Sequence, residues 1–410
     1  MDFDDTPDEA AFRAEARAFL DANARRKQRD AAVQRYGDVD DTRLAEAKAW
    51  QAKKAGAGFA CITWPDEWGG RGGTQMQQII YNQEEAQYDV PQGVFLIGLG
   101  MCVPTLMAYA PREQLARYVP PAVRGEEIWC QLFSEPSGGS DVAGLHTRAE
   151  RDGDDWVING QKVWTSGAHY SDYGLLIART DANVPKHEGI TAFYLSMKSP
   201  GVEIRPIHQM SGASHFNEVF FSNVRIPDAQ RLGAVGQGWK VAITTLMNER
   251  LAVGEIRRPD VDDLLTLARL VELDGRPAIA DRAVRERIAE WHARSQGLNY
   301  TRLRTLTALS RGETPGPENS IAKVVNAAKM QAIAMFGMDL LGMAGAVSDE
   351  RLAPMHALFQ NAMLSSPGMR IAGGSDEIMR NIIAERVLGL PGDVRVDKDV
   401  PFNRLPSGRR

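Results

Sequence analysis

Apolar and polar positions follow three different patterns along the chain, and the first has the spacing of helices. Residues 6–9 read Thr-Pro-Asp-Glu, which is typical of a helix start with a capping threonine and a glutamate that reaches back. Phe12, Phe19 and Leu20 then fall on one face of that helix. We therefore predict an N-terminal helical domain over residues 1–127.

The second pattern consists of short apolar runs separated by turn residues. Residues 156–163, 175–178 and 191–195 are such runs, and their even spacing predicts a middle antiparallel β domain over 128–234. From 235 to 410 helical periodicity returns with few breakers, which predicts a C-terminal helical bundle with a charged tail on the surface. The expected fold class is α+β.

Composition and charge exclude several classes of function. The 410 residues carry a net charge of −5, which is too mild for a nucleic-acid surface, and no apolar stretch is long enough to cross a bilayer. The acidic first five residues lack the apolar segment of a signal peptide. Cys61, Cys102 and Cys130 are widely separated, so we expect neither a metal site nor a disulfide framework, and the cytoplasm is the simplest compartment.

The densest candidate chemistry lies in the segment Ser-Glu-Pro-Ser-Gly-Gly-Ser-Asp at residues 134–141. Gly138 and Gly139 let the main chain approach a ligand closely because they have no Cβ. The three serines add hydroxyls that donate or accept hydrogen bonds. Such a loop suits a polar-edged ligand, and an ordinary surface turn is the alternative.

A second segment, residues 156–166, continues this candidate site. Asn159 and Gly160 form the strongest short hairpin signal, and a hairpin there would return Trp164 and Ser166 towards the Gly-rich loop. An aromatic face, small hydroxyls and free backbone amides together suit a flat ring such as a flavin. Two surface turns joined by an ordinary hairpin are the competing interpretation.

Both segments resemble the flavin-binding signature of the acyl-CoA dehydrogenase family. Three further motifs, one before and two after these segments, occur in the same order as in that family. These are a Trp-Pro…Gly-Gly turn at 64–70, a Gly-rich turn at 342–345 and a loop at 371–378. The resemblance extends over about residues 5–390 and implies the same three-part architecture. It also implies FAD as the cofactor, bound between the β domain and the C-terminal bundle.

The reaction that the resemblance implies is α,β-dehydrogenation of an acyl-CoA thioester to the 2-enoyl-CoA. A carboxylate removes the α-proton, the β-hydrogen leaves as hydride to flavin N5, and an electron-transfer flavoprotein accepts the electrons. An acyl-CoA oxidase and a non-catalytic subunit of a hetero-oligomeric dehydrogenase are the alternatives. We expect a homodimer or homotetramer, with a hetero-oligomer as the other assembly.

The position of the catalytic base departs from the commonest family pattern. That pattern places a carboxylate where this chain has Gly373, which cannot act as a base. A minority of the family, including isovaleryl-CoA dehydrogenases, instead carries a glutamate directly before an arginine on an early helix of the C-terminal bundle. Glu249 and Arg250 match that arrangement, so we assign Glu249 as the base, against the alternative of a solvated helix residue. The backbone N–H of Gly373 is expected to polarise the thioester oxygen.

The resemblance further implies which residues contact the two ligands. Substrate contacts are expected from Ser140, Asn248, Arg250 and Gly374. FAD contacts are expected from Gln131, Phe133, Ser134, Gly139, Ser140, Trp164, Thr165, Ser166, Asp339, Leu341, Gly342, Ser375 and Glu377.

Other positions also differ from the family's usual residues, including Asp274 in place of a phenylalanine and Gln131 where an aromatic is frequent, and three of them bear most on the site. Val271 replaces an arginine that reaches the flavin pyrophosphate of a neighbouring subunit, so Arg269 or Arg276, amide groups, or a different partner subunit would have to take its place. Asp339 stands where a glutamine is common, and an ionised aspartate cannot donate a hydrogen bond. Ala372 replaces an aromatic over the acyl pocket, which predicts a wider cavity for a bulky, branched or long acyl group.

Overall fold

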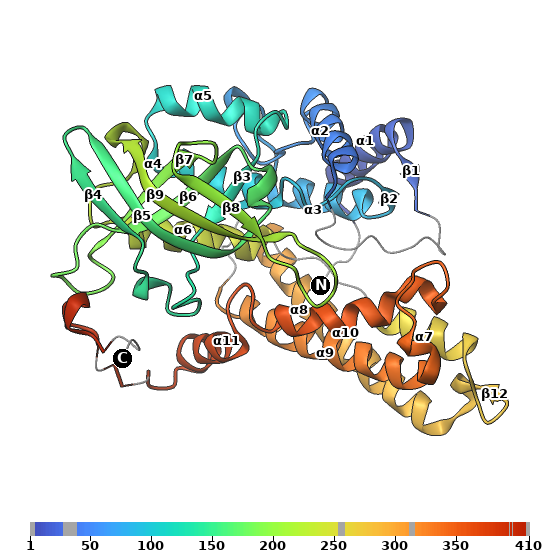
Figure 1. Cartoon of the computed structure of the whole chain (residues 1–410). Helices are drawn as coiled ribbons and strands as arrows, with labels where there is room; N and C mark the ends of the chain where they lie inside the picture. Colours follow the sequence, from blue (N-terminus) through green and yellow to red (C-terminus); the bar gives the residue numbers. More distant parts are fainter. Residues whose placement is uncertain are drawn as a thin grey trace. The chain divides into compact units, whose positions relative to one another are not determined.

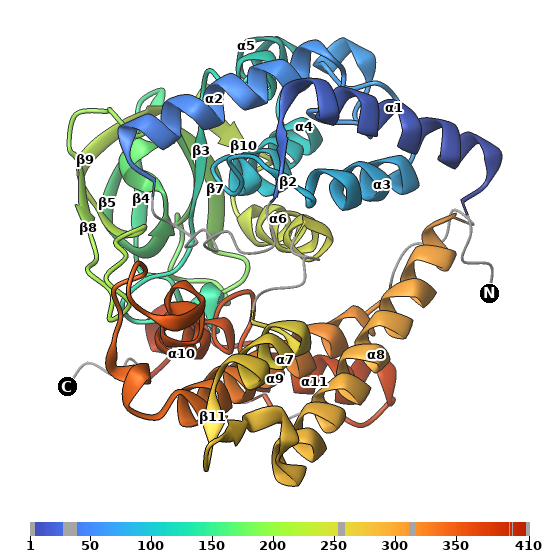
Figure 2. The ribbon, with the colours of Figure 1, turned by 90° about the vertical axis from the view of Figure 1, so that its right-hand side faces the viewer.

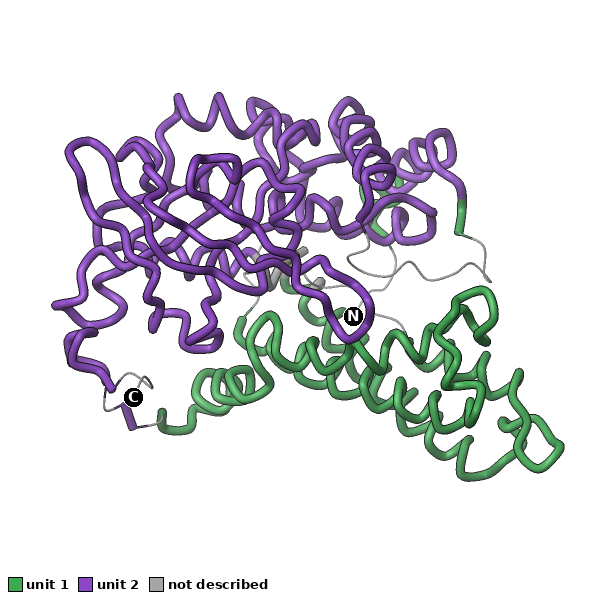
Figure 3. The backbone as a smooth tube through the Cα atoms, viewed as in Figure 1, with its two compact units in different colours: residues 1–11, 26–35, 254–392 green, residues 12–25, 36–253, 393–410 purple. Residues whose placement is uncertain are grey.

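A computed structural model (Figure 1) forms two compact units, which Figure 3 distinguishes. We call residues 12–25, 36–253 and 393–410 the mixed unit, and the remainder, chiefly 254–392, the helical unit. The side chains of residues 249–252, 306, 309–310 and 319 lie outside the described part of the chain. The structure describes residues 5–27, 39–252, 259–310, 316–392, 394–395 and 397–406.

The chain begins with helices, as the hydrophobic pattern predicts. The predicted start of the first helix is confirmed, because Thr6 Oγ1 accepts from the Glu9 N–H while the Glu9 carboxylate accepts from the Thr6 N–H at 2.8 Å. Phe12 and Leu20 are buried on the inner face. The helices are α1 (Pro7–Asn23), α2 (Asp41–Gly56), α3 (Gln75–Glu85), α4 (Val103–Tyr109) and α5 (Arg112–Val123), with the short strands β1 (Arg25–Arg26) and β2 (Tyr88–Asp89).

A sheet forms the centre of the mixed unit. The predicted antiparallel pairing holds for its principal pairs, but β3 runs parallel to β6, with Trp129 opposite Tyr173. Parallel pairing is allowed here because β4 and β5 lie between β3 and β6 in sequence and supply the long connection it requires. The strands are β3 (Trp129–Leu132), β4 (Arg148–Asp152), β5 (Asp155–Ser166), β6 (Tyr173–Arg179), β7 (Ile190–Ser196), β8 (Val202–Pro206), β9 (Phe216–Pro227) and β10 (Arg231–Leu232).

The predicted hairpin at Asn159 and Gly160 is wrong, because β5 runs straight through both residues. Gly160 instead lies at a register shift between β5 and β9, with φ of 151°. A Cβ on Gly160 would come within 2.6 Å of Thr147 Cα, so the glycine serves a close approach of two backbones. The Asn159 side chain exchanges hydrogen bonds with Asn223 across the sheet.

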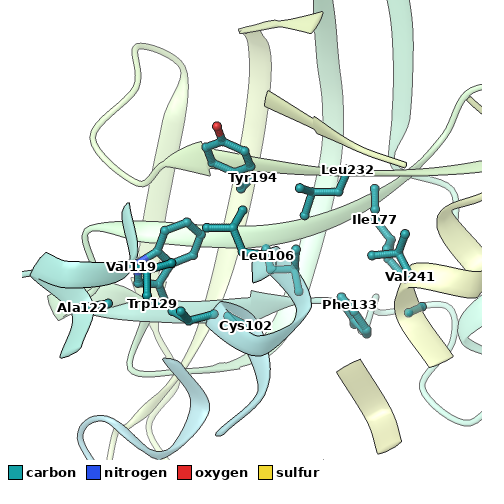
Figure 4. Packing of buried hydrophobic residues seen from close by; sticks show 14 of the residues in the cluster. Cys102, Leu106, Val119, Ala122, Trp129, Phe133, Ile177, Tyr194, Leu232 and Val241 are labelled. Carbon is teal, nitrogen blue, oxygen red and sulfur yellow. The ribbon is translucent and has the colours of Figure 1, made fainter. Parts of the chain in front are cut away.

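Helix α6 (Gly238–Ala252) belongs by its contacts to the mixed unit. Val241 is fully buried in a core cluster that Figure 4 shows from close by, together with Trp129 and Leu232. Thr245 Oγ1 lies 2.9 Å from Thr105 Oγ1 on α4. The three free cysteines are also buried in the mixed unit, and burial raises the pKa of the Cys61 and Cys130 thiols to about 12. The domain boundaries at 127 and 234 stay a prediction.

The helical unit packs around its own core of Leu264, Trp291, Ile333 and Phe359. Figures 1 and 2 show α8 and α9 side by side, and α10 lies close enough to α9 that a Cβ on Gly337 would collide with Phe359. No described helix is both long and apolar enough to span a bilayer. The elements are α7 (Val261–Leu270), β11 (Glu272–Leu273), β12 (Arg276–Pro277), α8 (Arg282–Ser310), α9 (Asn319–Leu341), α10 (Leu358–Met369) and α11 (Asp376–Ile382).

Candidate functional site

The Gly-rich loop, residues 134–141, joins β3 to the segment before β4 and begins with a tight turn. Glu135 and Gly138 exchange backbone hydrogen bonds at 3.1 and 3.0 Å. Gly139 and Ser140 beyond the turn are exposed, and a Cβ on Gly139 would meet no atom within 4 Å. The loop therefore presents an open stretch of backbone and a hydroxyl directly after a tight turn.

A buried ion pair, which the sequence motifs do not indicate, holds the start of this loop on the sheet. Lys162 on β5 is fully buried, and its Nζ lies 2.8 Å from Glu135 Oε1 while donating to the Phe133 carbonyl at 3.1 Å. The other contacts of the Glu135 carboxylate are the backbone N–H groups of His146 at 2.6 Å and Thr147 at 2.9 Å. Burial opposes ionisation of Glu135, but the Lys162 charge and these donors outweigh it and hold the pKa of that carboxyl below its ordinary value.

The end of β5 lies directly against this loop, because Val163 N donates to Ser134 O at 2.9 Å. Trp164 follows with φ of 59°, a conformation that non-glycine residues rarely adopt, and its side chain is 56% exposed. Thr165 is buried, and its Oγ1 has no hydrogen-bond partner among the described residues. Strained backbone and an exposed indole at one strand end are features that cluster at ligand sites.

These observations allow a test of whether a flavin fits the residues present. A planar ring needs an aromatic or open face, and Trp164 and Gly139 supply both. Its polar edge needs donors and acceptors, and Ser140, half-buried Ser166 and the unpaired Thr165 hydroxyl supply them. The chemistry of this part of the mixed unit fits a flavin.

The remaining predicted residues of the mixed unit are spread between sheet, core and helix. Gln131 is half-buried on β3 opposite Leu175, and the Phe133 ring is buried in the core while its carbonyl accepts from Lys162. Asn248 is half-buried on α6. Glu249 and Arg250 continue that helix in the backbone, and their side chains lie outside the described residues.

In the helical unit, the loop that carries Gly373 and Gly374 has a left-handed backbone, with φ of 66° and 90° at these residues. Lys323 Nζ donates to the Gly374 carbonyl at 2.5 Å and lies 3.4 Å from Asp376. Asp376 is buried and also accepts from Arg370 Nε at 2.7 Å. The N–H of Gly373 makes no hydrogen bond with another described residue, so it is free to bind an oxyanion.

The other predicted contacts in this unit lie at helix ends. Ser375 caps α11 by accepting from Ile378 N at 3.4 Å, and Glu377 is exposed in its first turn. Asp339 is exposed on the last turn of α9, Leu341 is buried in the core, and Gly342 ends the helix with φ of 52°. The structure thus groups the predicted residues within each unit.

Val271, in place of the family's arginine, ends α7 and leads into the β11–β12 hairpin. The two turn residues of that hairpin, Asp274 and Gly275, both have positive φ, as an Asp-Gly turn of this type requires. Arg269 in the last turn of α7 and Arg276 in β12 are both exposed. Either guanidinium is therefore accessible to an anionic group.

Substituting alanine for Gly374 is expected to destabilise the protein by about 1–3 kcal/mol, because φ of 90° strains any residue with a Cβ. The new Cβ would also meet Met379 Cε at 2.4 Å. Gly368→Ala on α10 is the matched control, since its Cβ would meet nothing within 4 Å and alanine favours a helix. Urea unfolding of both variants gives the comparison, and equal stability would show that this loop tolerates a side chain.

Comparison with known proteins decides the family. The chain matches the models "Acyl-CoA dehydrogenase, N-terminal domain" over residues 6–126, "middle domain" over 130–224 and "C-terminal domain" over 236–388. It belongs to the acyl-CoA dehydrogenase family. The predicted family and α+β architecture are confirmed, and this dehydrogenase is a flavin-dependent oxidoreductase of acyl-CoA metabolism.

Relatives of this dehydrogenase occur in mycobacteria. It is 39% identical over 352 residues to acyl-CoA dehydrogenase IpdE1 of Mycobacterium tuberculosis, covering 85% of this chain and 89% of that protein. It is 38% identical over 343 residues to acyl-CoA dehydrogenase FadE34 of the same organism, covering 83% of this chain but only 46% of that longer protein.

Two solved structures share the fold of this dehydrogenase over nearly its whole length. The ChsE4–ChsE5 complex from Mycobacterium tuberculosis has a TM-score of 0.77 and 28% identity, covering 96% of this chain and 100% of that one. The Tcur3481–Tcur3483 steroid ACAD has a TM-score of 0.79 and 26% identity, covering 96% and 100%. Both structures are named for two different components.

Proposed function

We propose that this chain catalyses FAD-dependent α,β-dehydrogenation of an acyl-CoA thioester to the 2-enoyl-CoA. The observation that carries the proposal is the end of β5, where exposed Trp164 and the unpaired Thr165 hydroxyl follow Val163, which is hydrogen-bonded to Ser134 in the Gly-rich loop. FAD, when bound, supplies the hydride acceptor at flavin N5. The residues predicted for FAD and substrate contacts keep those roles in this proposal.

The protein's own groups handle the α-proton and the thioester oxygen. Glu249 on α6 is the proposed base, and the free N–H of Gly373 is the proposed donor to the oxygen that gains charge as the proton leaves. Lys323 and Asp376 hold the loop around Gly373 before substrate binds, so little reorganisation is needed. A preorganised donor of this kind is worth about 3–4 kcal/mol in the transition state.

We propose a bulky acyl group as the substrate class. Ala372 and Gly373 are exposed small residues where the family usually has larger ones. One structural neighbour, at 26% identity, is named as a steroid ACAD, which supports including a steroid-bearing acyl-CoA in the bulky class. A short straight acyl chain would leave such a cavity partly unfilled and would bind with less apolar burial.

The proposed assembly is an oligomer in which a neighbouring chain completes the flavin site. Val271 cannot supply the charge of the missing arginine, and the two neighbours named above are two-component proteins. The neighbouring chain is a second copy, giving a homodimer or homotetramer, or a different subunit. An electron-transfer flavoprotein is the proposed acceptor, and three free buried thiols suit the reducing cytoplasm.

An anaerobic titration tests the proposed function. The purified protein is mixed with butyryl-, isovaleryl-, palmitoyl- and a steroid-bearing acyl-CoA while the flavin absorbance is followed. We expect the oxidised flavin band to bleach, and to bleach faster with the bulky esters. A flavin that no ester bleaches would reject the dehydrogenase, and rapid recovery of the band in air would favour an oxidase. Colourless protein would favour the non-catalytic subunit.

A further inference from the structure

We define residues 397–403 as the C-terminal strap. Within the mixed unit, the strap packs against residues that come much earlier in the sequence. Phe402 and Asn403 donate their backbone N–H groups to Val184 O and Ala182 O, both at 2.9 Å. These carbonyls lie in the connection between β6 and β7. The strap is therefore bound to this connection through its backbone, and not only by a single side-chain contact.

A chain of charges joins the strap to the end of the Gly-rich loop. Lys186 Nζ lies 2.6 Å from Asp397 Oδ2 in the strap and 2.9 Å from Asp141 Oδ2, directly after Ser140. Lys186 is only 9% exposed, so its interactions are screened less than those of surface pairs. Burial alone would lower the pKa of Lys186, but the two aspartates outweigh it and raise that pKa.

A second connection runs through a buried arginine. The Phe402 ring lies over the Arg179 guanidinium, with 3.8 Å from its carbon to the ring centroid, and the same ring contacts the His146 ring at 5.2 Å. Arg179 in turn donates through Nη2 to the Ala143 and Leu145 carbonyls at 2.5 and 3.3 Å. Both carbonyls belong to the segment that follows the Gly-rich loop.

We propose that the C-terminal strap positions the Gly-rich loop for its ligands, with Asp397 and Phe402 as the positioning residues. The loop's start is fixed to the sheet by Glu135 and Lys162, whereas its end is fixed through Asp141 and the carbonyls that Arg179 binds. Between these anchors the loop contains mainly small residues with few contacts, so the anchors set its shape. Only the identity of the ligands rests on the proposed function.

Amide hydrogen exchange of the ligand-free protein tests the strap directly. In Phe402→Ala, residues 137–147 are expected to exchange about tenfold faster, the factor that matches loss of a desolvated cation–π contact. Phe220→Ala is the matched control, because the Phe220 ring on β9 also covers an arginine, Arg205 at 4.6 Å, but takes no part in the contacts described above between the strap and the loop. Phe402→Leu keeps the apolar packing without the aromatic face and should give an intermediate rate.

A comparison of two aspartates near the C-terminus, Asp397 and Asp399, gives an independent test. Asp397→Asn should raise the dissociation constant for FAD and the KM for acyl-CoA several-fold with little change in kcat, while Asp399→Asn, at an exposed position, should change neither. Unchanged loop exchange in folded Phe402→Leu and Phe402→Ala would overturn the proposal, as would equal acceleration in Phe220→Ala. Failure of the proposed function leaves the exchange result intact, since that experiment needs no flavin.

Discussion

Replacing Lys162 by methionine should lower the free energy of unfolding by about 3–5 kcal/mol, because it leaves the buried Glu135 carboxylate without its cation. Methionine keeps most of the apolar volume, so the loss is electrostatic rather than a cavity. Urea unfolding measures the effect. Lys198→Met is the matched control, since Lys198 pairs with Asp172 at 3.0 Å but is 78% exposed, and its loss should cost at most about 1 kcal/mol.

The pH dependence of this variant separates charge from packing. In the wild type Glu135 has a depressed pKa, so its ion pair stabilises the fold above the unfolded pKa of about 4.3, and this contribution declines as pH falls below that value. In Lys162→Met the unpaired carboxyl should become protonated more readily. The deficit relative to wild type should therefore be smaller at pH 4 than at pH 7. A deficit independent of pH would indicate a packing defect.

Replacing both partners offers a further check on the same ion pair. Lys162→Met combined with Glu135→Leu removes both charges, so no buried ion is left unpaired and part of the lost stability should return; the rest stays lost because the His146 and Thr147 amides lose their acceptor. Flavin affinity should not return with it, because the leucine cannot accept from the His146 and Thr147 amides that shape the loop. Recovery of both stability and flavin affinity would show that the ion pair contributes only packing.

Glu249→Gln should lower the turnover number about 10²–10⁴-fold while leaving flavin binding intact, because glutamine has the shape of the base but cannot take the α-proton. The decisive measurement is exchange of the substrate α-hydrogen with deuterated solvent, which reports proton abstraction alone. Wild type should exchange it and the variant should not. Glu113→Gln on α5, an exposed carboxylate in the same unit, is the matched control.

Turnover within about threefold of wild type would place the base elsewhere, since general-base catalysis contributes far more than that. Asn248→Ala then serves as a second comparison, because Asn248 precedes Glu249 on α6 and is a proposed substrate contact. Its effect should fall on the KM rather than on α-hydrogen exchange at saturating substrate. Losses of the same kind in both variants would point to a distorted helix.

Local patterns predict the elements of this fold because their causes are local. The Thr6–Glu9 cap lies within one helical turn, and both of its hydrogen bonds form. The Asn159–Gly160 pair fails as a hairpin signal for the opposite reason. Its glycine serves a contact with Thr147, thirteen residues earlier, which no short pattern contains. Sequence periodicity therefore predicts the order of helices and strands better than the purpose of individual glycines.

The candidate site likewise contains some residues that a local pattern indicates and others that it does not. The sequence predicts Trp164 beside the Gly-rich loop through a hairpin, but the two meet along a straight β5, where Val163 N donates to Ser134 O. Lys162 also carries a signal, since it lies on the inward-facing side of β5 with Trp156 and Ile158, where a lysine needs a buried partner. Phe402 carries none, because its contact with Arg179 joins residues more than two hundred positions apart.

The burial of every cysteine has a practical consequence for studying this protein. Cys61, Cys102 and Cys130 all lie in the mixed unit, and a thiol with a pKa near 12 reacts slowly while the fold is intact. The native thiols are thus latent reporters that become reactive only when that unit opens. The helical unit has no cysteine in the printed sequence, so a single introduced thiol there can carry a spectroscopic label without removing the native ones.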